Sequence, residues 1–303
     1  MDKAEKIILV TGATGTQGKA VALELLQAGF KVRAQAFKSD ATDLEKAGAE
    51  IVRGSCDDME FLTKAMQGVY GLFSVQTPDI TGDDVERRHA KNLAEAALKS
   101  GVKQVVHASV SQVGNHENFP GWHEGRWEEG FQKYWTDKDD AMKSMVNTGF
   151  EYWTVLNPAM FMENYIPPKV YYMYPCLKQD EILTSLHVDT ESHLIAAEDI
   201  GKFAAAAFKD PKAFHGKLIG LAGDLLTTTA IAEKLGKVNG KKINAVHLSP
   251  QEALARGVSS MGVVMEEWMN EVGHNVDIKG LKEYGIHLTS FDEWLDKHKK
   301  ELL

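Results

Sequence analysis

Short apolar runs alternate with longer amphipathic segments over the first half of the chain. The run KIILVTG (residues 6–12) predicts a buried strand, and the next segment, TQGKAVALELLQAG, has apolar residues at helical spacing and ends at Gly29, a typical helix C-cap. The same pattern predicts strands at KVRAQAF, AEIVRG, VYGLFSV and KQVVHAS, with helices at DATDLEKAG, MEFLTKAMQG and DVERRHAKNLAEAALKSG between them. Because parallel strands need crossover connections, this alternation predicts a parallel sheet with helices on both faces.

The pattern changes after Ser109. A loop rich in Gly, His and Trp precedes a helix expected over residues 131–148 and a strand, EYWTVLNP, that ends at Pro158. The last third mixes short helical patterns (IAEKLGKV, SPQEALARG, SFDEWLDKHKK) with a short strand or two, and it contains no repeat and no low-complexity tract. We expect a first domain over residues 1–158 and a smaller lobe over residues 159–303, with some segments of the lobe returning to the first sheet.

Composition and charge narrow the class of protein. The 303 residues are 44% hydrophobic and 25% charged, which is ordinary for a globular protein. The formal net charge is −9, and no cluster of lysine or arginine stands out, so we expect no direct binding to nucleic acid or to an anionic membrane. The apolar run near the N-terminus is too short for a secretion signal or a membrane span, so a cytoplasmic protein is expected.

Metal and disulfide chemistry are not expected. Cys56 and Cys176 lack metal-ligand spacing and are interpreted as buried or half-buried thiols. The loop histidines His116 and His123 do not form a helical H-x-x-x-H frame, which is typical of a solvated loop rather than a metal site. Asp199, in AAEDIGKF, is predicted to be a helix N-cap.

A glycine-rich loop joins the first strand to the first helix. Gly12, Gly15 and Gly18 stand in TGATGTQG, where one glycine permits a tight turn, one lets the backbone approach a pyrophosphate and one allows close packing of helix on strand. Backbone N–H groups at the start of the helix attract an anion. We therefore predict a dinucleotide site, whose cofactor-binding residues also include the residues between the glycines, Thr14, Thr16 and Gln17.

The end of the second strand bears on the choice between NAD(H) and NADP(H). An acidic residue there holds the ribose 2′-OH of NAD, but this chain has Phe37 followed by Lys38. The absence of an acid favours NADP(H), with Lys38 as a cofactor contact, and NAD(H) stays open. Lys38 can equally be a solvated lysine, and Arg33 is expected on the strand surface.

Several segments together resemble the NmrA-like branch of the extended, atypical short-chain dehydrogenase/reductases. They are the G-x-x-G-x-x-G loop, VRA on the second strand, AEIVRGSCDD on the third, VVHASVSQVG on the fifth, NTGFEYWTVLNPAMFMEN on the sixth, and the late EDIG. The resemblance implies an α/β fold of the Rossmann type, a doubly wound parallel sheet with a smaller C-terminal α+β substrate lobe, and NADP(H) binding. The branch contains reductases of small carbonyl or quinone-type compounds, and also regulators that respond to dinucleotide and have lost the catalytic residues.

Two positions depart from the family pattern. Phe37 stands where the family often has an arginine, and Ser55 stands where an aspartate is common, which makes Asp57 the nearest candidate for the adenine pocket. We assign Thr77, after the fourth strand, and Pro158, at the end of the sixth, to the cofactor-binding set as well.

The chain contains three Tyr-x-x-x-Lys matches, and two of them carry proline inside the motif. Only Tyr134 and Lys138 can share one helix face, because proline disfavours the helical turn that places residues i and i+4 together. The resemblance assigns this pair to catalysis: Tyr134 is the acid, and Lys138 lowers its pKa and holds the nicotinamide ribose. Ser109 then orients the substrate oxygen, with Ser111 as the alternative. Tyr134 packing against Trp135, with Lys138 only a ribose ligand, stays open.

The expected substrate wall is aromatic and rich in methionine, which suits an apolar or aromatic small molecule. Its residues are His116, Trp122, His123, Trp127, Met160, Phe161 and Tyr165. We predict an NADP(H)-dependent oxidoreductase of a small carbonyl or quinone-like compound. The alternatives are a non-catalytic dinucleotide sensor that acts through a protein partner, and an enzyme that uses a base other than Tyr134. The sequence leaves open the substrate, the direction of the reaction and the oligomeric state.

Overall fold

The computed structural model describes residues 5–78 and 82–302, which form two compact units. The first unit contains the chain up to Gly114, Tyr134–Pro158 and Ala197–Gly220, and the second contains Asn115–Lys133, Ala159–Ala196 and the chain from Leu221 onward. The chain thus leaves the first unit after residue 158 and returns to it for residues 197–220. The domain bounds of 1–158 and 159–303 stay a prediction.

The first unit is built on a seven-stranded sheet with the order β10-β6-β5-β4-β1-β2-β3. Its strands are β1 (Ile7–Val10), β2 (Lys31–Ala36), β3 (Glu50–Arg53), β4 (Val69–Ser74), β5 (Gln104–Ala108), β6 (Tyr152–Pro158) and β10 (Lys217–Leu221). The pairs among β1 to β6 are parallel. Val10 aligns with Ala34 and with Phe73, so β1, β2 and β4 end at one edge of the sheet.

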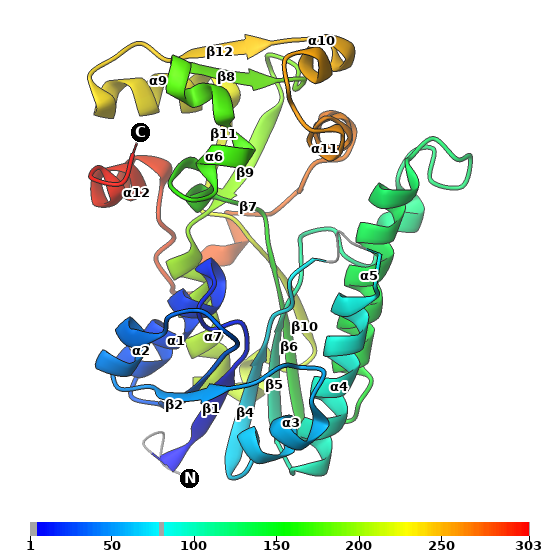
Figure 1. Ribbon diagram of the computed structural model, residues 1–303, viewed down its shortest axis with the longest axis vertical. Helices are drawn as coiled ribbons and strands as arrows, with labels where there is room; N and C mark the ends of the chain where they lie inside the picture. The colour runs from blue at the N-terminus through cyan, green and yellow to red at the C-terminus, as the bar shows by residue number, and fades with distance from the viewer. Residues whose placement is uncertain (1–4, 79–81, 303) are drawn as a thin grey trace. The chain divides into compact units, whose positions relative to one another are not determined.

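Helices cover both faces of this sheet, as predicted. Figure 1 shows α1 and α7 on one face and α4 with the later part of α5 on the other. The helices are α1 (Thr16–Gln27), α2 (Thr42–Lys46), α3 (Met59–Ala65), α4 (Val85–Lys99), α5 (Glu129–Val146), α7 (Ala197–Lys209) and α8 (Pro211–Phe214), with the first residues of α5 belonging to the second unit. The doubly wound α/β fold predicted from the sequence is confirmed.

Two local details show how the sequence sets these elements. Helix α1 ends as predicted, because Gly29 adopts a φ of +87° and the Phe30 N–H donates to Leu25 O, a helix-terminating arrangement. Helix α7 approaches α1 closely at Gly201, where a Cβ would lie 2.9 Å from Ala20 O. The N-cap prediction for Asp199 is wrong: the residue lies inside the first turn of α7, fully buried, and accepts a hydrogen bond from Lys202 Nζ at 2.7 Å.

The second unit mixes short strands and helices around its own core. Its strands are β7 (Met160–Phe161), β8 (Glu181–Thr184), β9 (Glu191–Ile195), β11 (Asp224–Thr227) and β12 (Asn244–His247). They form a β11-β9-β7 sheet and a β12-β8 pair. The helices are α6 (Val170–Met173), α9 (Thr228–Asn239), α10 (Pro250–Ala255), α11 (Ser260–Glu271) and α12 (Phe291–His298), with 3₁₀ turns η2 (His116–Asn118), η3 (Met162–Tyr165), η4 (Pro175–Gln179) and η5 (Gly280–Tyr284). This is the α+β lobe that was predicted.

Short helices of the second unit are fixed by their caps and by the core. Ser249 and Glu252 form a capping box at the start of α10, and Ser290 and Glu293 form another at the start of α12. Phe291, Trp294 and Leu295 then bury one face of α12 in the core cluster of the unit.

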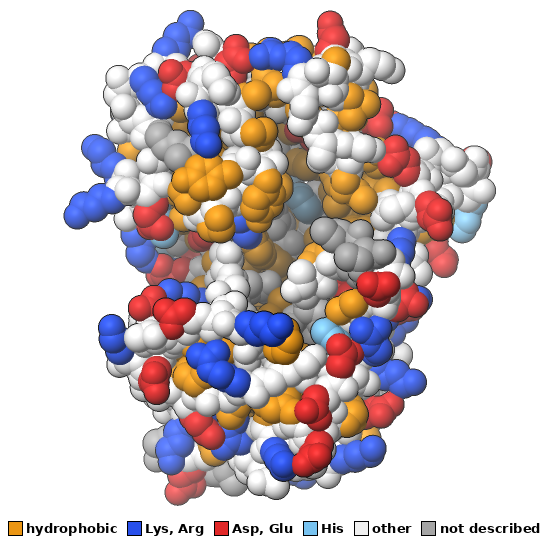
Figure 2. Space-filling model, in the orientation of Figure 1, with side chains coloured by type: hydrophobic (Ala, Val, Ile, Leu, Met, Phe, Trp, Pro, Cys, Tyr) orange, Lys and Arg blue, Asp and Glu red, His pale blue; other side chains and the backbone are white. Residues whose placement is uncertain are grey.

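Charged side chains are mixed on the face of the molecule that Figure 2 shows, where lysine and arginine alternate with aspartate and glutamate.

Within residues 5–78 and 82–302, no helix has the length and apolar character needed to cross a bilayer.

Candidate functional site

The three glycines form a tight loop after β1. Gly12 has a φ of +55°, and a Cβ on it would lie 3.2 Å from Val75 Cγ1. The Gly15 N–H donates to Gly12 O at 2.9 Å. At Gly18 a Cβ would lie only 2.2 Å from Gly12 O, which real structures do not tolerate. Glycine is therefore required at positions 12 and 18, whereas a Cβ at Gly15 would make a tight contact of 3.3 Å with Gly12 O.

The loop presents the N-terminus of α1 as an anion site. Gly15 is the N-cap and contributes no side-chain cap, and the first turn contains no acidic residue. The first N–H groups of a helix have no acceptor inside the helix. Beside them, Gln17 is buried, and its Nε2 has no hydrogen-bond partner among the described residues. Thr14 and Thr16 are half-buried in the same loop. These groups fit the pyrophosphate of a dinucleotide.

Two polar residues tie the loop to the neighbouring strands. Thr11 Oγ1 donates to Val75 O at 3.0 Å and accepts from Val75 N at 2.9 Å. Gln35 Oε1 accepts from Gly12 N at 3.0 Å, and its Nε2 donates to Gly54 O at 2.7 Å. Sequence reasoning missed Gln35, although a glutamine inside an otherwise apolar strand was a usable signal.

The end of β2 is basic rather than acidic. Lys38 is exposed, with its Nζ 5.1 Å from the centroid of the Phe37 ring, and that ring is 56% exposed. Arg33 is held on the strand surface by Glu50 at 2.8 Å and by the carbonyls of Ala65 and Gln67. It therefore serves the structure of the sheet.

Arg53 is a basic residue of this corner that sequence reasoning missed. It aligns with Ala36 at the end of β2, and its Nη1 donates to Ser39 O at 3.0 Å. Its place follows from strand register, which the sequence does not give.

The remaining predicted cofactor residues lie at the strand ends. Asp57 is engaged by α4: its carboxylate lies 2.7 Å from Arg88 Nε and 3.1 Å from His89 Nε2. These hydrogen bonds, that of Arg88 first, lower the pKa of Asp57 to about 2. Thr77 is exposed after β4. Pro158 is buried at the end of β6, where its carbonyl accepts from Ser111 N at 3.1 Å.

Tyr134 and Lys138 lie one turn apart on α5, as predicted. Lys138 Nζ is 5.8 Å from the centroid of the Tyr134 ring. The same Nζ is 2.5 Å from Glu86 Oε1, and this ion pair is buried, with Lys138 7% and Glu86 2% exposed. Sequence reasoning missed Glu86, which lies in α4 on the same helical face as the buried Ala90 and Leu93.

The electrostatics of Tyr134 differ from the expectation. Burial raises the pKa of Tyr134, and the negative charge of Glu86 raises that pKa further. The predicted lowering of this pKa by Lys138 is therefore wrong, because the lysine charge is matched by Glu86. The phenol stays protonated at neutral pH, a form that can donate a proton but not accept one.

Polar side chains gather at the ends of β4 and β5. Ser109 is buried after β5, where its N–H donates to Leu156 O at 2.9 Å and its Oγ has no hydrogen-bond partner within the described parts of the chain. His107 Nδ1 is 3.4 Å from Ser74 Oγ, which accepts from Gln76 Nε2 at 2.7 Å. Burial, and then the charge of Lys138, lower the pKa of His107 to about 3, so its imidazole is neutral.

The aromatic and methionine residues predicted to line the substrate site form two separate groups within the second unit. Residues of the loop before α5 pack mainly on one another and on α11: His116 on Trp122 at 4.9 Å, Trp127 on Phe131 at 4.7 Å and Phe119 on Trp268 at 5.7 Å between ring centroids. Met160 and Tyr165 instead line a cavity of this unit, to which His116, Trp122, His123, Trp127 and Phe161 do not contribute.

The cysteines and the other Tyr-x-x-x-Lys matches lie outside the site described above. Cys56 and Cys176 are free, half-buried thiols, as predicted. No group of His, Cys, Asp and Glu within the described residues has an arrangement that could hold a metal ion. The two proline-containing Tyr-x-x-x-Lys matches do not share a helix turn: Tyr165 ends η3, and Tyr174 separates α6 from η4.

The parallel sheet with a glycine loop between β1 and α1 defines a Rossmann-type α/β protein. More narrowly, the chain belongs to the NmrA-like family, whose model matches residues 4–295. This confirms the resemblance drawn from the sequence.

Individual relatives divide between enzymes and regulators. The (4-alkanoyl-5-oxo-2,5-dihydrofuran-3-yl)methyl phosphate reductase of Streptomyces griseus is 27% identical over 248 residues, 82% of this chain and 79% of that protein. The NADPH-dependent quinone oxidoreductase of Escherichia coli, solved with NADPH, superimposes with a TM-score of 0.75 at 22% identity, covering 96% and 99% of the two chains. NmrA, a negative transcriptional regulator solved with NADP, has a TM-score of 0.73 at 19% identity, covering 96% and 94%. At these identities the two structures show the shared fold.

Proposed function

We propose that this protein is an NADP(H)-dependent oxidoreductase that reduces a small carbonyl or quinone-like compound. The observation that carries the proposal is the position of a protonated Tyr134 one helical turn before the buried Lys138 on α5. Enzyme relatives support it, since the curated proteins that resemble this chain include a reductase and an NmrA-like family oxidoreductase.

NADP(H) is the cofactor that the first unit fits best. The glycine loop and the start of α1 would hold the pyrophosphate, with Thr14, Thr16 and Gln17 lining it. Lys38 and Arg53 would take the 2′-phosphate, because no acid ends β2 to bind the 2′-OH of NAD(H). Lys138 would hold the nicotinamide ribose, with Asp57, Thr77 and Pro158 as further contacts of the cofactor.

In the reaction, the chain moves one proton and orients one oxygen. The cofactor supplies a hydride to the substrate carbon when it is bound. Tyr134 donates its phenolic proton to the substrate oxygen, which takes up the electron pair of the C=O bond, and water then reprotonates the tyrosine. Ser109 Oγ, which has no partner within the described residues, donates a hydrogen bond to the same oxygen.

The raised pKa of Tyr134 keeps its phenol protonated at neutral pH. A reduction needs the protonated phenol, which is the dominant form at neutral pH when the pKa is above its ordinary value. The structure thus provides the protonated phenol that a reduction by NADPH needs.

The experiment is a cofactor titration followed by a substrate panel. Purified protein is titrated with NADPH and with NADH by fluorescence, and oxidation of the preferred cofactor is followed by absorbance with aldehydes, ketones and quinones. We expect tighter binding of NADPH and turnover with at least one class. Absence of dinucleotide binding would overturn the proposal.

A second candidate is a dinucleotide-binding regulator that acts through a protein partner. One observation favours it: Glu86 binds the ammonium of Lys138, so the lysine does not activate the tyrosine. Tight NADPH binding without oxidation across the panel is the result that this candidate predicts.

A further inference from the structure

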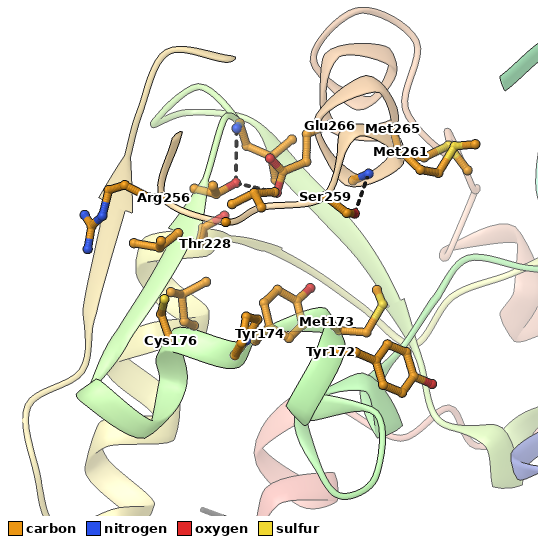
Figure 3. A pocket seen from close by; sticks show the side chains of 18 of the residues that line it. Tyr172, Met173, Tyr174, Cys176, Thr228, Arg256, Ser259, Met261, Met265 and Glu266 are labelled. Atoms are coloured by element: carbon orange, nitrogen blue, oxygen red, sulfur yellow. Dashed lines mark hydrogen bonds between the residues drawn. The ribbon is translucent and has the colours of Figure 1, made fainter. Parts of the chain in front are cut away.

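The second unit contains a cavity of about 360 Å³ that the dinucleotide site does not explain. Figure 3 shows it between the α6–η4 segment on one side and α11 with the loop before it on the other. All of its lining residues belong to the second unit, so it shares no residue with the glycine loop or with Tyr134, Lys138 and Ser109. A cavity of this size can take a small organic molecule.

Most side chains that line the cavity are apolar, and many of them are flexible methionines. Five methionines line it: Met160, Met173, Met261, Met265 and Met269. Methionine adapts its shape and makes favourable contacts with aromatic rings. Tyr174 adds a flat ring, held rigid by stacking on Tyr165 at 4.6 Å with an angle of 5° between the rings. This wall suits an aromatic ligand.

The charged groups of the wall are already engaged by the chain. Glu266 accepts hydrogen bonds from Thr184 Oγ1 at 2.8 Å and from the N and Oγ of Ser185 at 2.6 and 2.7 Å. Arg256 donates to Glu181 at 2.6 Å. A ligand therefore finds no unpaired cation among these groups, and the carboxylate of Glu266 repels an anion. The oxygens of Glu266 already accept three hydrogen bonds and so offer little to a cation, which favours an uncharged ligand.

One polar group of the wall is left without a partner. Ser192, on β9, is 1% exposed, and its Oγ has no hydrogen-bond partner among the described residues. It lines the cavity. A buried hydroxyl that lacks a partner is unfavourable, so a ligand oxygen that pairs with it is stabilised.

We propose that this cavity binds an uncharged aromatic molecule that carries one hydrogen-bonding oxygen, which pairs with Ser192. The exposed side chains of Tyr172 and Met173, which also line it, form its apolar mouth. No residue of the cavity belongs to the first unit, so ligand binding to it can be tested without dinucleotide.

The test uses three naphthalene probes, the full chain and no dinucleotide. Calorimetry measures the binding of 1-naphthol, 1-methylnaphthalene and naphthalene-1-sulfonate to the wild type and to Ser192→Ala. We expect 1-naphthol to bind at one site and to lose about fivefold in affinity in Ser192→Ala, because one hydrogen bond is removed. The methyl probe should bind both proteins equally, and the sulfonate should bind most weakly. Equal 1-naphthol affinities in both proteins, or no binding, overturn the proposal.

A filling variant, in which a larger side chain occupies the cavity, tests whether 1-naphthol binds there. Met265→Trp places a larger ring in the cavity, whereas Leu254→Trp changes a nearby residue of α10 that is exposed and does not line it. We expect 1-naphthol binding to be lost in the first variant and retained in the second. If Met265→Trp does not fold, Met261→Trp at the exposed edge of the cavity replaces it. Undiminished binding in the folded filling variant contradicts the assignment.

Discussion

At the scale of single residues, the pair of Glu86 and Lys138 is the feature on which the site depends most. Both side chains are buried, and each charge has the other within 2.5 Å. Breaking a buried ion pair from one side leaves an uncompensated charge in the interior. Glu86→Gln should therefore lower the free energy of unfolding by about 3 kcal/mol.

Urea denaturation measures this loss. The matched control is Glu60→Gln, which breaks an exposed pair with Lys64 at 2.7 Å and should change stability by less than about 0.5 kcal/mol. Removal of the Glu86 charge should also bring the pKa of Tyr134 closer to its ordinary value. Equal stability of Glu86→Gln and the wild type would show that the pair contributes nothing.

The residues of the site differ in whether their roles can be predicted from the sequence. Gly12, Gly15 and Gly18 were predictable, because their demand is local: a turn and a close approach inside one strand–helix junction. Arg53 was not predictable, because its place depends on strand register. Glu86 was not predictable, because its partner Lys138 comes from a distant part of the chain. For the same reason the pKa of Tyr134 was predicted in the wrong direction.

At the scale of elements, the packing of α1 on the glycine loop should be intolerant of a single methyl group. A Cβ at Gly18 would lie 2.2 Å from Gly12 O, so Gly18→Ala must displace the helix from the loop. We expect NADPH affinity to fall at least about 100-fold, because the N–H groups that face the pyrophosphate lose their alignment. Fluorescence titration measures this change.

A second glycine provides the control for this prediction. At Gly130, on α5, a Cβ would lie 3.4 Å from Met261 Cε, an ordinary contact. Gly130→Ala should bind NADPH as the wild type does. Retention of NADPH affinity in Gly18→Ala would contradict the assignment of the loop.

Elements were predictable to the extent that their signal is local. Strands β1, β4, β5 and β6 are largely buried, β2 and β3 are shorter patterns between turn signals, and the crossover helices between β1 and β5 show a clear period, so all were identified. Strand β7, only Met160–Phe161, pairs with β9 some thirty residues later and has no pattern of its own. The N-cap prediction for Asp199 failed because burial and Lys202, rather than helix-end chemistry, determine its place.

At the scale of the whole molecule, His107 should make stability fall in mild acid. Its folded pKa is about 3 and its unfolded value is about 6.5, so between these values the unfolded chain binds a proton that the folded chain does not. Stability is therefore full above the unfolded pKa and falls as the pH drops. From about pH 7 to about pH 5.5 the loss from this residue should be about 1 kcal/mol.

Urea unfolding at the two pH values checks this prediction. His107→Gln removes the titrating group, so the variant should lose about 1 kcal/mol less than the wild type over the same interval. The comparison isolates His107 from the other histidines, which titrate equally in both proteins. The same pH dependence in both proteins would mean that His107 carries its proton in the folded state.

The proposed function rests on Tyr134 as the proton donor of an NADPH-dependent reduction. The most direct measurement compares the rate of NADPH oxidation with a simple naphthoquinone in the wild type, in Tyr134→Phe and in Tyr152→Phe, a tyrosine outside the site. We expect a rate at least about 100-fold lower in Tyr134→Phe, with unchanged NADPH affinity, and a rate equal to that of the wild type in Tyr152→Phe. Equal turnover in Tyr134→Phe and the wild type would contradict the proposed function.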